Sequence, residues 1–324
     1  MTTTTTLPPA TARLTMTFDE ERLVRDVRQL REREWHLQQT IADDGSLTQS
    51  PVDWRCLALR SLGGDPNRTD PGGPGLLEFA DTPWLDKAPY LAEVLRAIPG
   101  ELRSARLMAL APGVSSAEHD DNKYGPAWGT ARVHVPVVTT EGALLYLDGV
   151  AYQWQPGEFW FGDFSRPHKV SNTGTVTRVH LVVDTLVTDQ LLALFPSKHR
   201  EQLDGRVLIN KRRVPLTGTE LGAYRVGFAV PQSFLGWEEP DGEFLRPQPT
   251  TDVYTEVVDG RLVLFADDQP LLGLVHVGDG EFRWAGWTDE RTFTITRDGE
   301  GATVTIRSRV GSAERSARLT AHPR

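Results

Sequence analysis

Three residues of metal-binding types lie in two short segments of the sequence. His119 and Asp121 stand two positions apart in ALAPGVSSAEHDDNKYG, and His168 follows in FSRPHKVSN. If the first segment is extended, the two-residue period of a strand sends both side chains to one face while Asp120 points away. Two histidines and one carboxylate on one face of an ion leave three positions open, as in oxygen-activating ferrous sites. Spacing alone also allows unrelated surface or core residues, because the chain has 8 histidines.

A second feature is an arginine within an apolar strand. Arg178 belongs to TRVHLVVD, inside the expected strand Val176–Asp184. An unpaired guanidinium is costly to bury, so it should meet a carboxylate, which it can bind through two parallel hydrogen bonds. A dicarboxylate cosubstrate is a candidate for that partner. His180 shares the face of Arg178, and we interpret it as a supporting residue rather than a ligand.

Five further residues close to these segments are candidates for substrate contact. They are Lys123, Tyr124, Trp128, Arg132 and Arg166. The cationic side chains could bind a substrate carboxylate, although a solvated rim is an equal alternative for those that follow Asp121. The tryptophan could line a pocket, although aromatic side chains on strands more often belong to the core.

The elements that would position these residues are short and rich in β-branched and aromatic residues. Turn residues such as Pro112-Gly113 and Pro156-Gly157 separate them. This spacing favours an antiparallel barrel or sandwich, such as a jelly roll, over alternating strands and helices. The fold that we expect is a jelly roll of the cupin-like, double-stranded β-helix type. No glycine-rich phosphate loop follows a strand, which argues against a dinucleotide-binding fold. The expected strands are Leu102–Leu110, Ala131–Thr139, Ala143–Leu147, Tyr152–Trp154, Glu158–Phe161, Lys169–Asn172 and Val176–Asp184.

Helices are expected to flank this mostly β core. Thr17 and Glu20 form a possible capping box before a helix over about Phe18–Leu37. The Gly- and Pro-rich stretch that continues to about Thr82 predicts a long loop. A short helix is expected over Pro89–Ile98.

The chain is expected to have three parts. Residues 1–16 are a disordered tail, 17–200 a jelly-roll domain with N-terminal helices, and 201–324 a β-rich accessory domain. Hairpins in the last part are expected at Asp259-Gly260 and Asp298-Gly299. Its sheet edges could receive an extended peptide as an added strand.

Composition limits the possible partners. The formal net charge of -9 disfavours binding to nucleic acid phosphates or to an anionic membrane. The single cysteine, Cys56, excludes a disulfide within one chain and suits a reducing cytoplasm. The first residues contain no apolar run of signal-peptide length, and nowhere do 18 consecutive apolar residues appear, so we expect neither export nor membrane insertion. It leaves the oligomeric state open, with a homodimer as one option.

The run Leu102–Asp184 resembles the aspartyl/asparaginyl β-hydroxylase family, which includes bacterial L-proline hydroxylases. The matching segments are LRSARLMALAPGVSSAEHDD, ARVHVPV and GEFWFGDFSRPHKVSNTGTVTRVHLVVD. Many relatives have His-Arg-Asp where this chain has His-Asp-Asp. The resemblance does not extend to the C-terminal β-rich part.

The resemblance implies an Fe(II)- and 2-oxoglutarate-dependent dioxygenase with O2 as its other cosubstrate. By this likeness His119, Asp121 and His168 bind Fe(II), and Arg178 pairs with the distal carboxylate of 2-oxoglutarate. His134, in Arg-Val-His, is expected near the other end of that cosubstrate. Related oxygenases that halogenate usually have a small residue at the position of Asp121, so its carboxylate favours hydroxylation.

The substrate class follows less directly. We expect hydroxylation of an amino-acid side chain, with release of succinate and CO2. The target would be an Asp- or Asn-like residue in a peptide of natural product biosynthesis, or a free amino acid such as proline. A non-catalytic metal- or ligand-binding cupin-like barrel is the alternative from another functional class.

Overall fold

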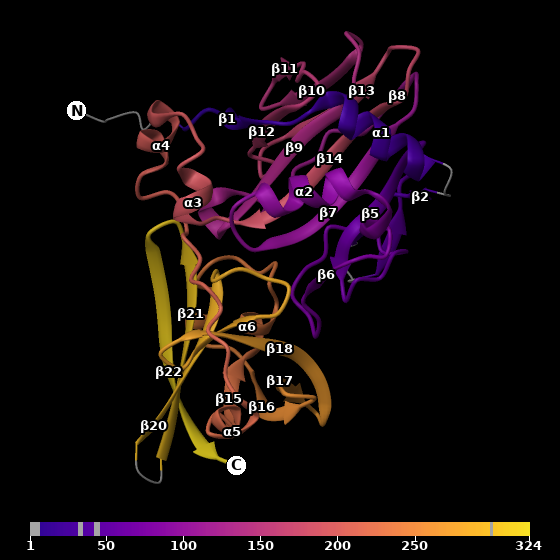
Figure 1. Cartoon of the computed structure of the whole chain (residues 1–324). Coiled ribbons are helices and arrows are strands. Elements are labelled where there is room, and N and C mark those ends of the chain that lie inside the picture. The colour runs from indigo at the N-terminus through magenta and orange to yellow at the C-terminus, as the bar shows by residue number, and fades with distance from the viewer. Residues whose placement is uncertain (1–6, 32–34, 42–45, 299–300) are drawn as a thin grey trace, which may run out of the picture. The chain divides into compact units, whose positions relative to one another are not determined.

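The chain folds into two compact units. The computed structural model describes residues 7–31, 35–41, 46–298 and 301–324. The first unit comprises residues 1–72, 79–126 and 130–204, and the second comprises residues 73–78, 127–129 and 205–324. Figure 1 shows the helices and strands of both. Within the described part of the chain, no helix is long and apolar enough to span a membrane.

A large antiparallel sheet forms one wall of the first unit. Its order is β1-β12-β9-β14-β7-β5-β2, with β6 paired to β5. The long central strands are buried along almost their whole length. The bounds are β1 Thr11–Thr17, β2 His36–Leu37, β5 Trp54–Leu62, β6 Phe79–Asp81, β7 Leu102–Leu110, β9 Thr130–Val138, β12 Glu158–Gly162 and β14 Arg178–Leu186.

A smaller sheet packs against this wall. Its order is β11-β10-β13-β8, with bounds Val150–Tyr152, Ala143–Leu147, His168–Asn172 and Val114–Ser115. One apolar cluster contains Leu110 of the large sheet together with Leu145 and Val170 of the small one. The two sheets therefore enclose a shared core, which confirms the expected double-stranded β-helix. A separate hairpin pairs β3 (Gln39–Ile41) with β4 (Leu47–Gln49).

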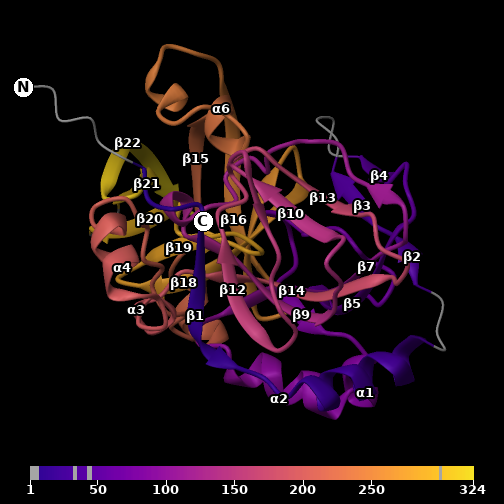
Figure 2. The same ribbon diagram turned by 90° about the horizontal axis from the view of Figure 1, so that it is seen from above.

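Two helices lie side by side against the large sheet (Figure 2). Helix α1 spans Glu20–Arg31 and α2 spans Pro89–Ala97. The buried carboxylate of Asp26 in α1 accepts hydrogen bonds from the N–H groups of Tyr90 and Leu91, at 2.8 and 2.9 Å. It thereby caps α2 and stabilises the positive end of that helix. The first unit ends with α3 (Asp189–Leu192) and α4 (Ser197–Leu203), and η1 (Leu85–Lys87) precedes α2.

Three expectations for the N-terminal part are wrong. Residues 11–16 are not a tail but belong to β1, where Ala12 and Leu14 are buried and Arg13 is exposed. Residues 1–6 lie outside the described residues. Asp19, not Thr17, caps α1, because its carboxylate accepts from the N–H of Arg22 at 3.0 Å. That helix ends at Arg31, before the expected limit.

The expected long loop up to Thr82 also needs correction. It contains β5, a nine-residue strand that lies between β7 and β2 in the large sheet. Four consecutive residues of β5, 56–59, are almost fully buried. A strand that is covered on both faces lacks the alternation that would reveal it in the sequence.

The turn before β12 shows why one predicted turn residue is a glycine. Gly157 has a φ of 71°, in the left-handed region, and a Cβ there would collide with the carbonyl oxygen of Phe18. The N–H of Phe18 donates to the Gly157 carbonyl at 2.8 Å. Glycine therefore joins the end of β1 to the start of β12.

The second unit contains a closed eight-stranded barrel in chain order. Pairing of β15 with β22 closes it, so its described strands leave no complete sheet edge free. The expectation that a peptide adds to an open sheet in this part is therefore wrong. The bounds are β15 Val226–Pro231, β16 Thr250–Val258, β17 Arg261–Ala266, β18 Gln269–Gly278, β19 Glu281–Trp284, β20 Arg291–Asp298, β21 Gly301–Val310 and β22 Ala313–Pro323.

Both expected hairpins are present in this barrel. Val258 pairs with Arg261 across Asp259-Gly260, whose φ angles of 49° and 70° are those of a tight hairpin turn. Asp298 pairs with Gly301, and the turn between them lies outside the described residues. Short helical segments complete the unit: α5 Gly218–Gly222, α6 Gln232–Leu235 and η3 Glu243–Leu245. The short helix η2 (Pro126–Trp128) begins at the last residue of a first-unit segment, and its other residues belong to the second unit.

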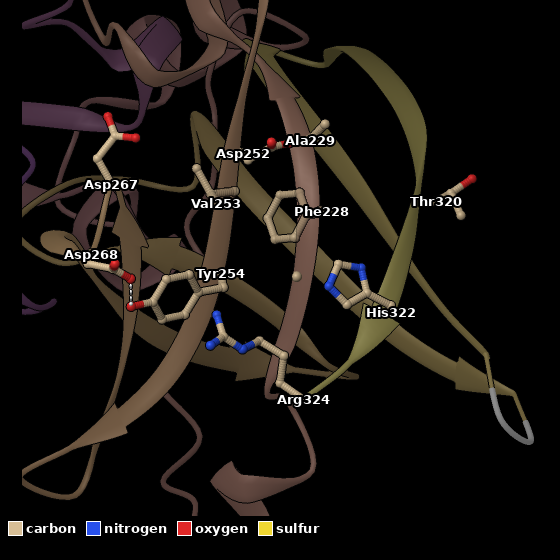
Figure 3. A pocket seen from close by; sticks show the side chains of 11 residues that line it. Phe228, Ala229, Asp252, Val253, Tyr254, Asp267, Asp268, Thr320, His322 and Arg324 are labelled. Carbon is tan, nitrogen blue, oxygen red and sulfur yellow. Dashed lines mark hydrogen bonds between the residues drawn. The ribbon is translucent and has the colours of Figure 1, made fainter.

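A groove of about 580 Å³ crosses the outer surface of the barrel (Figure 3). Its floor is formed by Gly227 and Ala229 of β15, which have little or no side chain. The hydroxyl of Tyr254 donates to Asp268 at 2.9 Å, and the guanidinium of Arg324 lies 3.7 Å from the centre of the Tyr254 ring. The polar side chains along the groove are largely exposed and partly paired with one another, so we assign it no function.

Candidate metal centre

The three predicted ligands lie together in the first unit. His119 follows β8 and His168 begins β13, and their backbones form a two-way bridge with N–H to O distances of 3.0 and 2.8 Å. The N–H of Asp121 donates to the carbonyl of Phe164 at 2.9 Å. These contacts bring one possible ligand atom from each of the three side chains within 4.8 Å of one another. The three side chains are therefore close enough together to bind one metal ion.

Hydrogen bonds also orient both imidazoles. Nδ1 of His119 lies 3.1 Å from the carbonyl oxygen of Ala117, and Nδ1 of His168 lies 2.9 Å from that of Arg166. Because a carbonyl only accepts, Nδ1 of each ring is the donor in this contact, and Nε2 is the nitrogen that is available to a metal. Burial lowers the pKa of His168, which favours the neutral form that ligation needs. Nε2 of His119 is 3.6 Å from Oδ1 of Asp121.

A buried ion-pair network adjoins the third ligand candidate. Asp184 on β14 accepts from Nε of Arg132 on β9 at 2.7 Å and from Nη2 of Arg106 on β7 at 3.3 Å. Ser104 donates to it at 2.7 Å. Arg132 in turn forms an ion pair with Asp121. Burial alone would raise the pKa of Asp184, but the two guanidiniums outweigh it and lower that pKa to about 2.

Sequence reasoning missed Asp184 and Arg106, and treated Arg132 only as a substrate contact. The available signal was a carboxylate at the end of the apolar strand TRVHLVVD and an arginine in the middle of LRSARLMAL. Buried charges of opposite sign on neighbouring strands are expected to pair. The register that makes them neighbours, Asp184 opposite Arg132, is a long-range property that local spacing does not reveal.

We expect Asp184→Asn to destabilise the first unit at neutral pH by about 3–5 kcal/mol, because the buried guanidinium of Arg106 loses its carboxylate and that of Arg132 loses one of two. The folded-state pKa of Asp184 is lower than its ordinary value of 3.8, so this stabilisation is present above that value. It is lost as the pH falls toward about 2. Urea unfolding between neutral and acidic pH should show a shallower pH dependence for the variant in this acidic window. The control is Asp53→Asn, which removes an exposed pair with Arg55 and should change little.

Arg178 has a different environment from Arg132. Its side chain is buried, and its Nη2 lies 2.9 Å from Nδ1 of His180. Among the residues that the structure describes, no carboxylate lies within ion-pair distance of it. Burial lowers the pKa of Arg178 to about 10, so the guanidinium remains charged at neutral pH. A buried cation without a counter-ion is unfavourable, and this position therefore suits an anionic ligand.

Aromatic contacts connect Arg178 to the three ligand candidates. The ring of His134 lies 5.7 Å from that of His180 and stacks on Phe164 at 5.1 Å. Phe164 meets His168 edge to face at 4.8 Å. A row of contacting side chains in the interior of the unit therefore connects His168 to the buried guanidinium of Arg178.

Several polar atoms along this row lack a hydrogen-bond partner within the described ranges. They are both ring nitrogens of His134, Nε2 of His180 and the indole nitrogen of Trp154. Burial, followed by the charge of Arg178, lowers the pKa of both histidines well below the usual range, so both are neutral. Unpaired buried polar groups beside a buried cation fit a bound polar anion.

The remaining predicted substrate residues have mixed environments. The hydroxyl of Tyr124 donates to the Gly72 carbonyl at 2.9 Å, and Lys123 is buried with a φ of 58°. Arg166 forms ion pairs with two carboxylates at 3.0 and 2.9 Å, which favours a structural role. Trp128 belongs to the second unit, where its carbonyl accepts from a threonine hydroxyl. Their contact with a substrate stays a prediction.

The segment that contains these residues matches a family model. The model for aspartyl/asparaginyl β-hydroxylases matches residues 17–187, which is more than half of the chain. The chain therefore belongs to the aspartyl/asparaginyl β-hydroxylase family and is a hydroxylase. This confirms the resemblance noted over Leu102–Asp184 and extends it toward the N-terminus. No curated protein matches the sequence.

Solved structures similar to this chain have low sequence identity to it. An oxidoreductase of the 2OG-Fe(II) oxygenase family from Burkholderia pseudomallei is 12% identical over 54% of this chain and 85% of its own, with a TM-score of 0.36. A Trichoplax adhaerens prolyl hydroxylase, solved with a hypoxia inducible factor peptide, is 12% identical over 59% and 86%, with a TM-score of 0.37. A cupin domain from Bordetella pertussis Tohama I is 20% identical over 28% and 88%, with a TM-score of 0.22.

Proposed function

We propose that this hydroxylase depends on Fe(II) and 2-oxoglutarate and hydroxylates an amino-acid side chain, with release of succinate and CO2. The observation that carries the proposal is the buried, uncompensated charge of Arg178 in the unit that holds the cluster of His119, Asp121 and His168. A triad of this type leaves positions open for a chelating cosubstrate and oxygen. The cation offers a second anchor for a dicarboxylate.

The residues present fit these groups. His119, Asp121 and His168 would hold the iron through two imidazole nitrogens and a carboxylate oxygen. Arg178 would pair with the distal carboxylate of 2-oxoglutarate, and His134 would lie near its other end. When bound, iron and 2-oxoglutarate supply the oxidising power for inserting oxygen into a C–H bond. The buried aromatic rings of Phe164 and Trp154 would keep bulk water from this interior.

The carboxylate of Asp121 supports hydroxylation rather than halogenation, since it fills the position that a halide would need. Membership in a family of hydroxylases argues against the alternative of a non-catalytic binding barrel. It also supports an Asp- or Asn-like side chain as the target, and we place that residue in a peptide of natural product biosynthesis. A free amino acid such as proline is the second option.

We place the reaction in a reducing cytoplasm. Cys56 is the single cysteine of the chain, and it is buried. Burial raises the pKa of its thiol to about 12, so the thiolate that oxidants attack is rare at neutral pH. This thiol is therefore suited to a structural role in the core.

Two measurements test the proposed function. Anaerobic protein with Fe(II) and 2-oxoglutarate is expected to develop a weak visible charge-transfer band. On exposure to oxygen, a mass-spectrometric screen of peptides and free amino acids is expected to find a product with one added oxygen and matching succinate. Absence of both the band and the succinate would contradict the proposal. The identity of the modified compound decides between peptide and free amino acid.

A further inference from the structure

We infer that Arg132 is a positioning residue that occupies one carboxylate oxygen of Asp121 and leaves only the other to bind the metal. The inference rests on the proposed function, in which Asp121 is an iron ligand. In this arrangement the ion pair between Arg132 and Asp121 keeps one coordination position of the metal open for a reactant.

The two oxygens of Asp121 face different partners. Oδ2 forms the ion pair with Nη1 of Arg132. Oδ1 lies 3.6 Å from Nε2 of His119, the nitrogen that is available to a metal. The oxygen that faces the histidine ligand is therefore the one that does not pair with the arginine.

Arg132 is held in place on its other edge. Nε donates to Oδ1 of Asp184 at 2.7 Å, and Nη2 donates to Oδ2 of the same carboxylate at 3.2 Å. This fork leaves Nη1 for Asp121. The Arg132 side chain is only 10% exposed. A planar guanidinium bound through two parallel hydrogen bonds has a defined direction, so it presents its third nitrogen at a fixed place.

Aromatic rings and a second arginine restrict the network further. The centre of the Tyr124 ring lies 4.8 Å and that of Phe164 5.3 Å from Cζ of Arg132. Asp184 itself is held by Arg106, a residue of the next strand. Rotation of Arg132 away from Asp121 would have to disturb these contacts. The ion pair is therefore a built feature of the large sheet rather than a flexible surface contact.

This arrangement matters because a carboxylate can bind a metal through one oxygen or two. Binding through two would fill one of the three positions that a facial triad leaves open. A chelating cosubstrate and oxygen together require all three. Because Oδ2 stays paired with Arg132, it does not bind the metal, and the coordination position that it would fill remains open for a reactant.

The test counts the water ligands of Mn(II) bound in place of iron, from the broadening of its electron paramagnetic resonance lines in ¹⁷O-enriched water. The wild type is expected to hold about three waters, the number of positions that a facial triad leaves open. Arg132→Met is expected to hold about two, because both oxygens of Asp121 become available. Arg132→Lys, which keeps the charge but lacks the planar fork that fixes the direction toward Asp121, is expected to show the same loss.

The matched control is Arg106→Met, which removes the other guanidinium from Asp184 and leaves the pair with Asp121 in place. Its water count should equal that of the wild type, although its stability should fall. Wild-type water counts in both Arg132 variants would overturn the inference alone. Asp121→Ala tests the proposed ligand set separately from the role of Arg132. Mn(II) binding and a water count that this variant leaves unchanged would overturn that ligand set.

Discussion

Asp121→Ala is expected to abolish both iron binding and turnover. The variant removes the one carboxylate of the ligand cluster, and two imidazoles without it hold a divalent ion poorly. Loss of an outer-shell partner alone reduces metal affinity or activity by about 10–100-fold, so loss of a ligand should exceed that range. Calorimetry with Fe(II) under anaerobic conditions gives the affinity, and succinate release gives turnover.

Asp120→Ala is the matched control for this prediction. Asp120 is an exposed carboxylate next to Asp121, and its removal takes away the same charge without touching the cluster. The control should bind iron within a few-fold of the wild type. If Asp121→Ala retained normal hydroxylation, or if both variants lost iron to the same extent, the ligand set would be wrong.

The three ligand candidates could be picked out from the sequence because their signal is local. His119 and Asp121 are close in the chain, and His168 lies in a segment with strong family character. Their convergence still depends on a long-range contact, the bridge between the backbones of His119 and His168. The family resemblance, rather than the spacing, made that convergence predictable.

Features that depend on pairing between distant strands could not be predicted in this way. The pairing of Arg132 with Asp184 follows from the register of β9 against β14. Closure of the C-terminal barrel follows from pairing of β15 with β22, the first and last of its strands. In both cases the residues that meet are far apart in the chain, and their local sequence is compatible with other partners.

Two of the buried arginines of the first unit, Arg132 and Arg178, illustrate a general distinction. Arg132 contacts two carboxylates of its own chain, and so it stabilises the fold whether or not a ligand is present. Arg178 has a neutral histidine as its hydrogen-bond partner, and burial lowers its pKa to about 10. A buried charge of this kind is unfavourable in the folded chain unless an anion binds beside it. Substitution of the two residues should therefore have opposite consequences for stability and for cosubstrate binding.

Arg178→Met is accordingly expected to raise the apparent 2-oxoglutarate requirement strongly. Truncating one side of a buried, hydrogen-bonded charge pair costs about 2–5 kcal/mol. This corresponds to an increase of roughly 30-fold to several thousand-fold in the concentration needed. Succinate release measured against 2-oxoglutarate concentration gives the requirement. An unchanged requirement would move the role of carboxylate anchor to another basic residue.

The stability of the same variant distinguishes a binding residue from a structural one. Without cosubstrate, the free energy of unfolding of Arg178→Met should lie within about 1 kcal/mol of the wild-type value, or above it. The reason is that the loss of the hydrogen bond to His180 is offset by the removal of an unpaired buried charge. Arg106→Met, which breaks a buried ion pair, should lose about 3–5 kcal/mol. Added 2-oxoglutarate should stabilise the metal-loaded wild type but not Arg178→Met. A large loss of stability in ligand-free Arg178→Met would mean that this arginine supports the fold, and the observation that carries the proposed function would no longer point to a cosubstrate.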